Sequence, residues 1–118
     1  MTEIQERLLL ELKAAAEQRH GRPLRVYQDT WAIMICNLGL GPAAPEDVVE
    51  EYIWNAAGNL LIRVVYVVWE HIVGEDHEWG RFGTQRQAEA RIAALFSSGS
   101  LGAGEYYITR LYTTRPLA

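Results

Sequence analysis

The feature of this sequence that most constrains its fold is a long apolar run from Leu60 to Val73, rich in valine and isoleucine. One arginine, one glutamate and one histidine interrupt it. β-branched side chains suit a pleated strand, and apolar residues here occupy both odd and even positions, so the run predicts a strand covered on both faces. A turn over Gly74–His77 and a returning strand over Glu78–Phe82 would complete a central hairpin.

The N-terminal segment from Thr2 to His20 predicts a helix. Thr2-x-x-Gln5 has the form of a capping box, and apolar residues follow it at helical spacing. Gly21 and the proline after it are typical of a helix end. A short extended piece, Leu24 to Tyr27, is expected next.

Two segments in the first half of the chain also carry helical spacing. In Trp31–Leu38 the spacing and the following glycine favour a helix, but its β-branched residues equally fit a buried strand, and both interpretations stay open. In Pro45–Ala57 a proline in the first turn, acids near the positive end of the dipole and an apolar stripe (Val49, Tyr52, Ile53 and Ala56) predict a helix.

The last third of the chain predicts a helix followed by a strand. Thr84-x-x-Gln87 repeats the capping-box form and opens a helix to about Phe96. A loop rich in serine and glycine, Ser97–Gly104, leads to an aromatic strand, Glu105–Thr114, expected to pair with the hairpin. The expected fold is α+β: one domain, residues 1–118, with N-terminal helices packed on a small, mainly antiparallel sheet, in the order helices and then β-β-α-β.

Composition and charge restrict the function classes. The only cysteine, Cys36, is interpreted as a small buried hydrophobic residue, and it excludes an intrachain disulfide. No signal peptide or membrane span is predicted, so a cytoplasmic protein is expected. The net charge is −4, but residues 26–62 hold five acids without a lysine or arginine, whereas residues 81–118 hold five arginines and two glutamates.

The acidic middle of the chain gives the candidate site. Four of its carboxylates would share one face of the predicted helix Pro45–Ala57, with no basic partner one turn away, and three more follow the apolar run. Such a patch is complementary to a basic surface, including one that otherwise holds phosphates. The predicted partner-binding residues are Glu46, Asp47, Glu50, Glu51, Glu75, Asp76 and Glu78.

Other chemistries find less support in the sequence. No catalytic residue, cofactor motif or metal site is predicted, because Glu70 and His71 would point to opposite faces of a strand and no nucleophile motif is present. A basic aromatic surface could hold single-stranded nucleic acid, but the pI of about 5.3 opposes it, so direct nucleic-acid binding is not expected. That surface would comprise Arg81, Arg86, Arg91, Arg110 and Arg115 with Trp79, Tyr106, Tyr107 and Tyr112.

The chain resembles two kinds of known protein. The stretch GRFGTQRQAEARIAALF, followed by a strand, resembles the strand–helix–strand of small α+β domains, among them peptidoglycan-binding SPOR domains. The whole chain is similar in kind to the small acidic inhibitors of phages and mobile elements, such as anti-CRISPR proteins, which act by occupying a partner's binding surface.

The predicted function is non-enzymatic: a small acidic inhibitor that binds the basic surface of a nucleic-acid-handling protein. A homodimer formed through the C-terminal strand, binding a small ligand or a peptide, is the alternative interpretation. An enzyme with an unrecognised site is the third.

Overall fold

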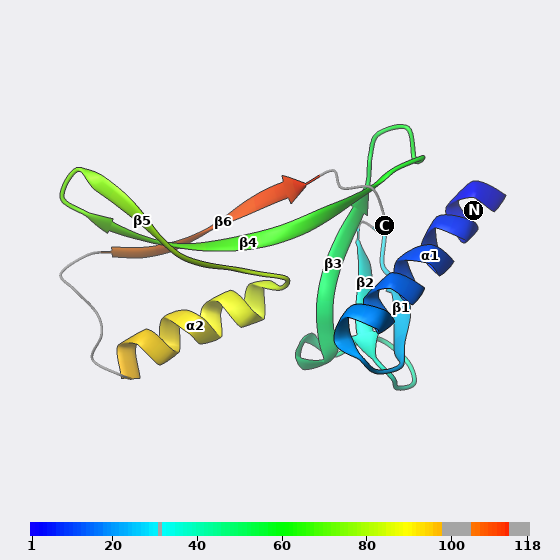
Figure 1. Ribbon diagram of the computed structural model, residues 1–118, viewed down its shortest axis with the longest axis horizontal. Coiled ribbons are helices and arrows are strands. Elements are labelled where there is room, and N and C mark those ends of the chain that lie inside the picture. Colours follow the sequence, from blue (N-terminus) through cyan, green and yellow to red (C-terminus); the bar gives the residue numbers. More distant parts are fainter. Residues whose placement is uncertain (31, 98–104, 114–118) are drawn as a thin grey trace. The chain divides into compact units, whose positions relative to one another are not determined.

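The computed structural model describes residues 1–30, 32–97 and 105–113 (Figure 1). It confirms the α+β fold class, with helices packed on a mainly antiparallel six-stranded sheet in the order β1-β2-β3-β4-β5, and with β6 paired to β4. The elements are α1 (Glu3–His20), β1 (Leu24–Gln28), β2 (Ile33–Asn37), the 3₁₀ turn η1 (Pro45–Asp47), β3 (Val48–Trp54), β4 (Leu61–Ile72), β5 (Glu75–Phe82), α2 (Gln85–Ser97) and β6 (Glu105–Thr113).

Contacts within the chain fall into two compact units. The N-terminal unit holds residues 1–64 and the end of β6, and the C-terminal unit holds residues 65–111. Strand β4 contributes residues to both units. The single domain expected from the sequence stays a prediction.

Local signals at both ends of α1 act as predicted. The Thr2 hydroxyl accepts a hydrogen bond from the Gln5 N–H, and the Gln5 side-chain oxygen accepts one from the Thr2 N–H, each over 3.1 Å. Gly21 takes the left-handed conformation, with φ of 67°, and its N–H donates to the Glu17 carbonyl over 2.8 Å. These bonds satisfy backbone groups that a helix end leaves without partners.

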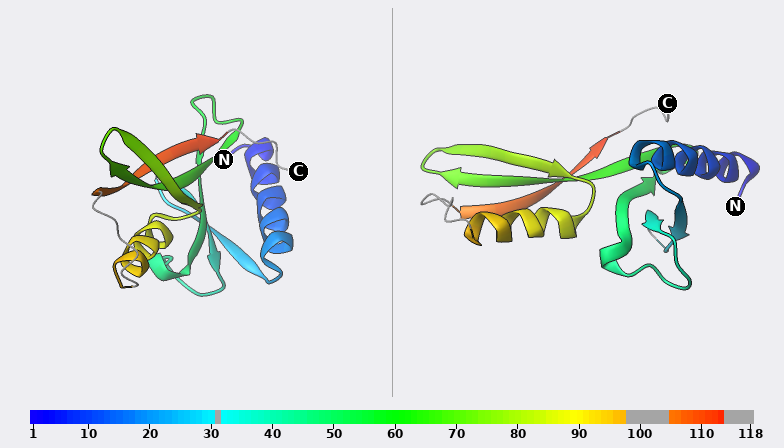
Figure 2. Two further views of the ribbon diagram at one scale, coloured as in Figure 1. Left: turned by 60° about the vertical axis from the view of Figure 1, so that its left-hand side comes forward. Right: turned by 60° about the horizontal axis from the view of Figure 1, so that its bottom comes forward.

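The core of the N-terminal unit lies between α1 and one face of the sheet, which Figures 1 and 2 show side by side. Strands β1 to β4 pair antiparallel in chain order, so alternate side chains of each strand point to this face. The helix contributes Leu9, Leu12 and Ala16, and the strands contribute Leu24, Ile33, Ile35, Tyr52 and Leu61.

The structure decides one open alternative in this unit in favour of a strand, and it shows that the helix predicted over Pro45–Ala57 is wrong. The segment Trp31–Leu38 forms strand β2 over Ile33–Asn37, with Trp31 outside the described residues. In Pro45–Ala57 only the single turn η1 is helical, and Val48–Trp54 is strand β3. Both segments have spacings that suit either period, and hydrogen bonding to strands on both sides outweighs the local helical preference.

The C-terminal unit contains the predicted hairpin. Its turn is shorter than expected: β4 and β5 are joined by Val73 and Gly74 alone, with Gly74 at a φ of 80° that glycine adopts most readily. The charged residues 75–77, expected in the turn, therefore belong to β5.

Helix α2 follows the hairpin and covers one face of the C-terminal unit's sheet (Figures 1 and 2). The Thr84 hydroxyl accepts from the Gln87 N–H over 3.2 Å, as the sequence predicts, whereas the Gln87 side chain accepts from the Gly83 N–H. Ala88 and Leu95 are buried. The pairing of β6 with β4 is also confirmed.

Nearly all of the loop expected between α2 and β6, from residue 98 to 104, lies outside the described residues, and so does Thr114. Neither described helix combines the length and the apolar run that crossing a bilayer would require.

Two neighbouring leucines on α1 test this packing. Leu12 is 0% exposed and Leu10 is 69% exposed. Leu12→Ala should lower the free energy of unfolding by about 3 kcal/mol because it leaves a cavity in the core, and Leu10→Ala should change it by less than about 0.5 kcal/mol. Chemical denaturation of both variants is the measurement. Equal effects would contradict the described face of α1.

Candidate functional site

The four carboxylates predicted to share a helix face are not arranged that way. Glu46 is exposed in η1, Asp47 and Glu51 are half-buried, and Glu50 is only 1% exposed. In strand β3 the side chains of Glu50 and Glu51 point to opposite faces of the sheet. The prediction of an acidic helix face is therefore wrong. Glu50 is buried and cannot contact a partner.

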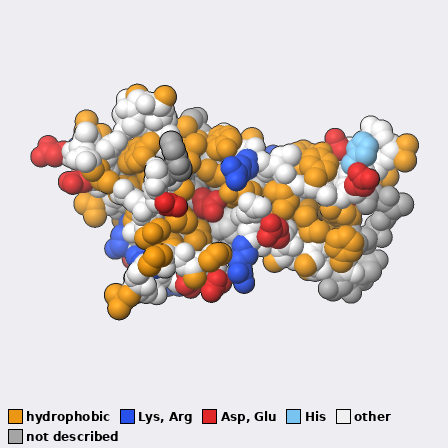
Figure 3. Space-filling view, turned by 180° about the vertical axis from the view of Figure 1, so that it is seen from behind, with side chains coloured by type: hydrophobic (Ala, Val, Ile, Leu, Met, Phe, Trp, Pro, Cys, Tyr) orange, Lys and Arg blue, Asp and Glu red, His pale blue; other side chains and the backbone are white. Residues whose placement is uncertain are grey.

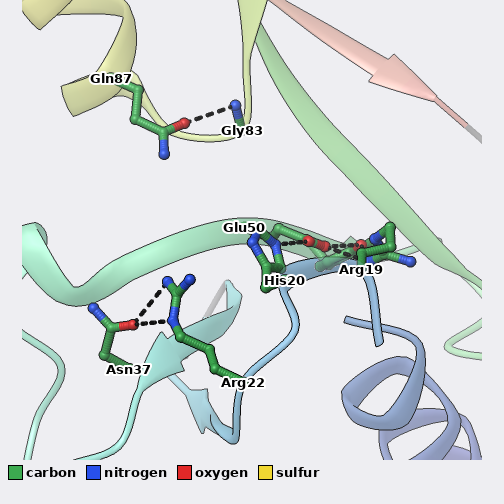
Figure 4. A network of polar contacts seen from close by, with 8 residues as sticks. Arg19, His20, Arg22, Asn37, Glu50, Gly83 and Gln87 are labelled. Carbon is green, nitrogen blue, oxygen red and sulfur yellow. Dashed lines mark hydrogen bonds and ion pairs between the residues drawn. The ribbon is translucent and has the colours of Figure 1, made fainter. Parts of the chain in front are cut away.

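Glu50 is instead the centre of a polar cluster between β3 and the last turn of α1 (Figure 4). Arg19 donates from Nη2 to Glu50 Oε1 over 2.7 Å, and Tyr52 donates its hydroxyl to the same oxygen over 2.6 Å. His20 Nε2 lies 2.6 Å from Glu50 Oε2. Both carboxylate oxygens thus have close partners, as a buried carboxylate requires.

This environment sets the ionisation of the cluster. Burial by itself would raise the pKa of Glu50, but the hydrogen bonds from Tyr52, Arg19 and His20 and the charge of Arg63 hold that pKa below its ordinary value of 4.5. The pKa of Tyr52 is raised, first by burial and then by its bond to the Glu50 carboxylate. The cluster joins the end of α1 to β3, and both carboxylate oxygens of Glu50 are bonded within it. We therefore assign the cluster a structural role.

Removing this charge gives a pH-dependent prediction. Glu50→Gln should lower the free energy of unfolding at pH 7 by about 2 kcal/mol, a value reduced from that of a fully buried pair because Arg19 is partly solvated. Because the folded-state pKa lies below 4.5, the contribution of the ionised carboxylate is complete above that pH and is lost as the pH falls below it.

The difference between wild type and Glu50→Gln should accordingly be largest above pH 4.5 and shrink below it. Denaturant unfolding over a pH series measures this difference. Glu11→Gln, an exposed change on α1, is the control and should have little effect at any pH. A difference that does not depend on pH would contradict the cluster.

The other three predicted acids, Glu75, Asp76 and Glu78, all lie exposed on β5 in the C-terminal unit. Each has a basic neighbour. Asp76 Oδ1 lies 2.8 Å from His71 Nδ1, with both side chains about half exposed, and Glu75 lies 3.5 Å from His77. Glu78 accepts from Arg81 over 3.1 Å. Three carboxylates and one arginine thus lie at the end of the hairpin, and only Glu78 contacts that arginine, so this end has an excess of acidic side chains.

Two aromatic rings lie on the sheet face away from α2. Trp69 of β4 and Tyr107 of β6 have nearly parallel rings, 15° apart, with centroids separated by 6.4 Å. Trp69 donates from Nε1 to the Thr109 hydroxyl over 2.8 Å. The pKa of Tyr107 is raised, first by partial desolvation, then by the negative charge of Asp76 and by the hydrogen bond to it. These bonds fix both rings on a face where strand alternation also places His71 and Asp76.

The apex of the hairpin is apolar. Val73 is 98% exposed, and Ile72 beside it is also exposed. The turn requires a glycine at Gly74 but nothing in the turn requires a β-branched residue at position 73. We call the residues on both sides of this hairpin end the hairpin surface: Trp69, His71, Asp76, Glu78 and Tyr107 on the face away from α2, Ile72 and Glu75 on the other face, and Val73 in the turn.

Figure 3 shows histidine and acidic side chains beside hydrophobic ones at its right-hand end, in the C-terminal unit. Sequence reasoning found the acids of the hairpin surface but missed Ile72 and Val73. The predicted strand ran to Val73, whereas β4 ends at Ile72, so neither residue was expected at the turn.

The remaining candidate residues do not form a second site. Cys36 is fully buried, and that burial raises the pKa of its thiol, as expected for a small hydrophobic residue. Trp79 is partly buried and donates from Nε1 to the buried carboxylate of Glu70 over 2.9 Å. Within residues 1–30, 32–97 and 105–113, no three histidine, cysteine or acidic side chains come together as a metal site.

The arginines and aromatics of the predicted nucleic-acid surface do not gather on one face either. Arg86 and Arg91 lie on α2, and Tyr106 and Tyr107 point to opposite faces of β6. Arg115 lies outside the described residues. Comparisons with protein-family models, with curated proteins and with solved structures find no significant match.

Proposed function

We propose that this chain is a non-enzymatic, cytoplasmic protein-binding domain, and that the hairpin surface is where its partner docks. The observation that carries the proposal is the exposed apolar apex, Ile72 and Val73, at the end of an acidic hairpin. An apolar anchor surrounded by charged residues is the usual anatomy of a protein interface.

The neighbouring aromatic rings strengthen this argument. Hydrogen bonds to Thr109 and Asp76 already hold Trp69 and Tyr107 in place, so little conformational entropy is lost when a partner covers them. Aromatic residues presented in this way are the kind that dominate binding energies in measured interfaces.

The charge of the surface indicates the kind of partner. Glu75, Asp76 and Glu78 outnumber Arg81, so a basic partner surface is complementary and would be attracted over long range. The basic surface of a nucleic-acid-handling protein fits this charge, and covering it would inhibit that protein. The acids of η1 and β3 are not needed for this proposal.

Substitutions at the apex test the proposal. Val73→Asp, and separately the pair Glu75→Arg with Glu78→Arg, should each abolish capture of the partner from a lysate of the native host. Val73 and Glu75 are highly exposed, so folding should survive, which circular dichroism can check. The readout is the set of proteins retained by the immobilised chain, identified by mass spectrometry.

Leu40→Asp is the matched control, because Leu40 is fully exposed and lies outside the hairpin. A partner retained by wild type and by Leu40→Asp, but lost in both hairpin variants, would support the proposed surface. Retention by the two hairpin variants would refute it. Capture by wild type should also weaken with rising salt, because the exposed charges are screened.

A further inference from the structure

A groove in the N-terminal unit lies beside α1 and has no part in the hairpin surface. It encloses about 480 Å³. Its lining is Met1, Glu6, Leu9, Leu10, Lys13, Val26 and Gln28. Leu10 and Met1 are apolar, but most of the surface of each is exposed and neither belongs to the core. The groove is thus an apolar surface that folding alone does not use.

Strand β1, which supplies Val26 and Gln28 to the groove, is the end strand of the sheet among the described residues. Two bonds fix the direction of its backbone groups. The Asp29 N–H donates to the Ala32 carbonyl over 2.9 Å, so the backbone N–H and C=O groups of odd-numbered residues in β1 point toward β2. The Leu24 N–H donates instead to Glu17 Oε2 over 2.9 Å, on the side of α1. The backbone N–H and C=O groups of even-numbered residues in β1 therefore point away from β2, toward the open edge of the sheet.

The outward backbone groups of Val26 and Gln28 have no hydrogen-bond partner within the described part of the chain. An unpaired strand edge of this kind can accept a further strand. Glu17 occupies the N–H of Leu24 and so closes the edge at that end. The open stretch is short, and it lies directly against the apolar groove.

We propose that this edge and groove bind a short extended segment of another protein, which adds as a strand to β1. Its main chain pairs with Val26 and Gln28, and its apolar side chains contact Leu9 and Leu10. The inference is independent of the hairpin surface, since every residue it uses lies in the N-terminal unit.

The charged side chains of the groove are Glu6 and Lys13, which balance each other. Lys13 lies 3.5 Å from Glu17 on its own helix, and this ion pair offsets its charge. Glu6, exposed at the rim of the groove, has no ion pair in the part of the chain that the structure describes. The lining thus holds one acid and one base, and the bound segment is recognised by its main chain and its apolar side chains.

A displayed random-peptide library, selected on the immobilised full-length chain, provides the probe. Selection should enrich peptides with alternating apolar residues. Hydrogen exchange with a synthetic peptide of that consensus should newly protect the amides of Val26 and Gln28. The amide of Leu24 should not change, because it is already bonded to Glu17.

Variants of the groove make the assignment specific. Leu10→Asp should weaken peptide binding about tenfold or more, because it places a charge where an apolar contact forms. Gln28→Pro should do the same by removing an outward N–H that β2 does not use. Leu40→Asp, an exposed change outside the groove, should change nothing.

Three results would overturn the proposal. The first is a selection without enrichment. The second is a peptide that binds wild type, Leu10→Asp and Gln28→Pro equally, or that leaves Val26 and Gln28 unprotected. The third is protection of these two amides that grows with protein concentration without peptide, which would identify a second copy of the chain as the occupant.

Discussion

Strand β4 is the constraint on which the rest of this structure depends. Its twelve residues pair first with β3 and then with β5, and β6 also pairs with it. Where a strand is covered on both faces of the sheet, the side chains on both faces are mostly apolar. In β4, five of the seven residues from Val64 to Glu70 are buried. The single sequence feature that specifies this strand therefore supplies residues to both compact units.

Burial of Glu50 shows how the N-terminal unit accommodates a charge in its interior. A carboxylate without partners would cost several kilocalories per mole, so it would neutralise or stay exposed. Here the last turn of α1 brings Arg19 and His20 to both oxygens, and Tyr52 completes the set. Cations at a helix C-terminus also interact favourably with the helix dipole. The contact that tolerates the charge thus also fixes where α1 ends on the sheet.

Both proposed binding surfaces include groups that folding leaves unused. At the hairpin apex a valine occupies a turn position where it gains no burial, and Trp69 and Tyr107 are held in place on the face opposite α2. On β1 the outward backbone groups of Val26 and Gln28 lie against exposed apolar side chains of α1. Packing does not explain the exposed side chains of Val73 and Leu10, which gain little burial in this structure.

The sequence by itself determined the elements whose signals are local. Thr2 with Gln5, Gly21, and Thr84 with Gln87 fix helix ends by hydrogen bonds within a few residues, and the run around Val64–Trp69 specifies a strand by composition. It also placed Glu75, Asp76 and Glu78 on the hairpin. Only the tertiary structure decided that Ile33–Asn37 and Val48–Trp54 are strands and that Glu50 is buried. Their spacing suits either period, and the groups that settle it, on α1 and on the paired strands, are distant in the chain.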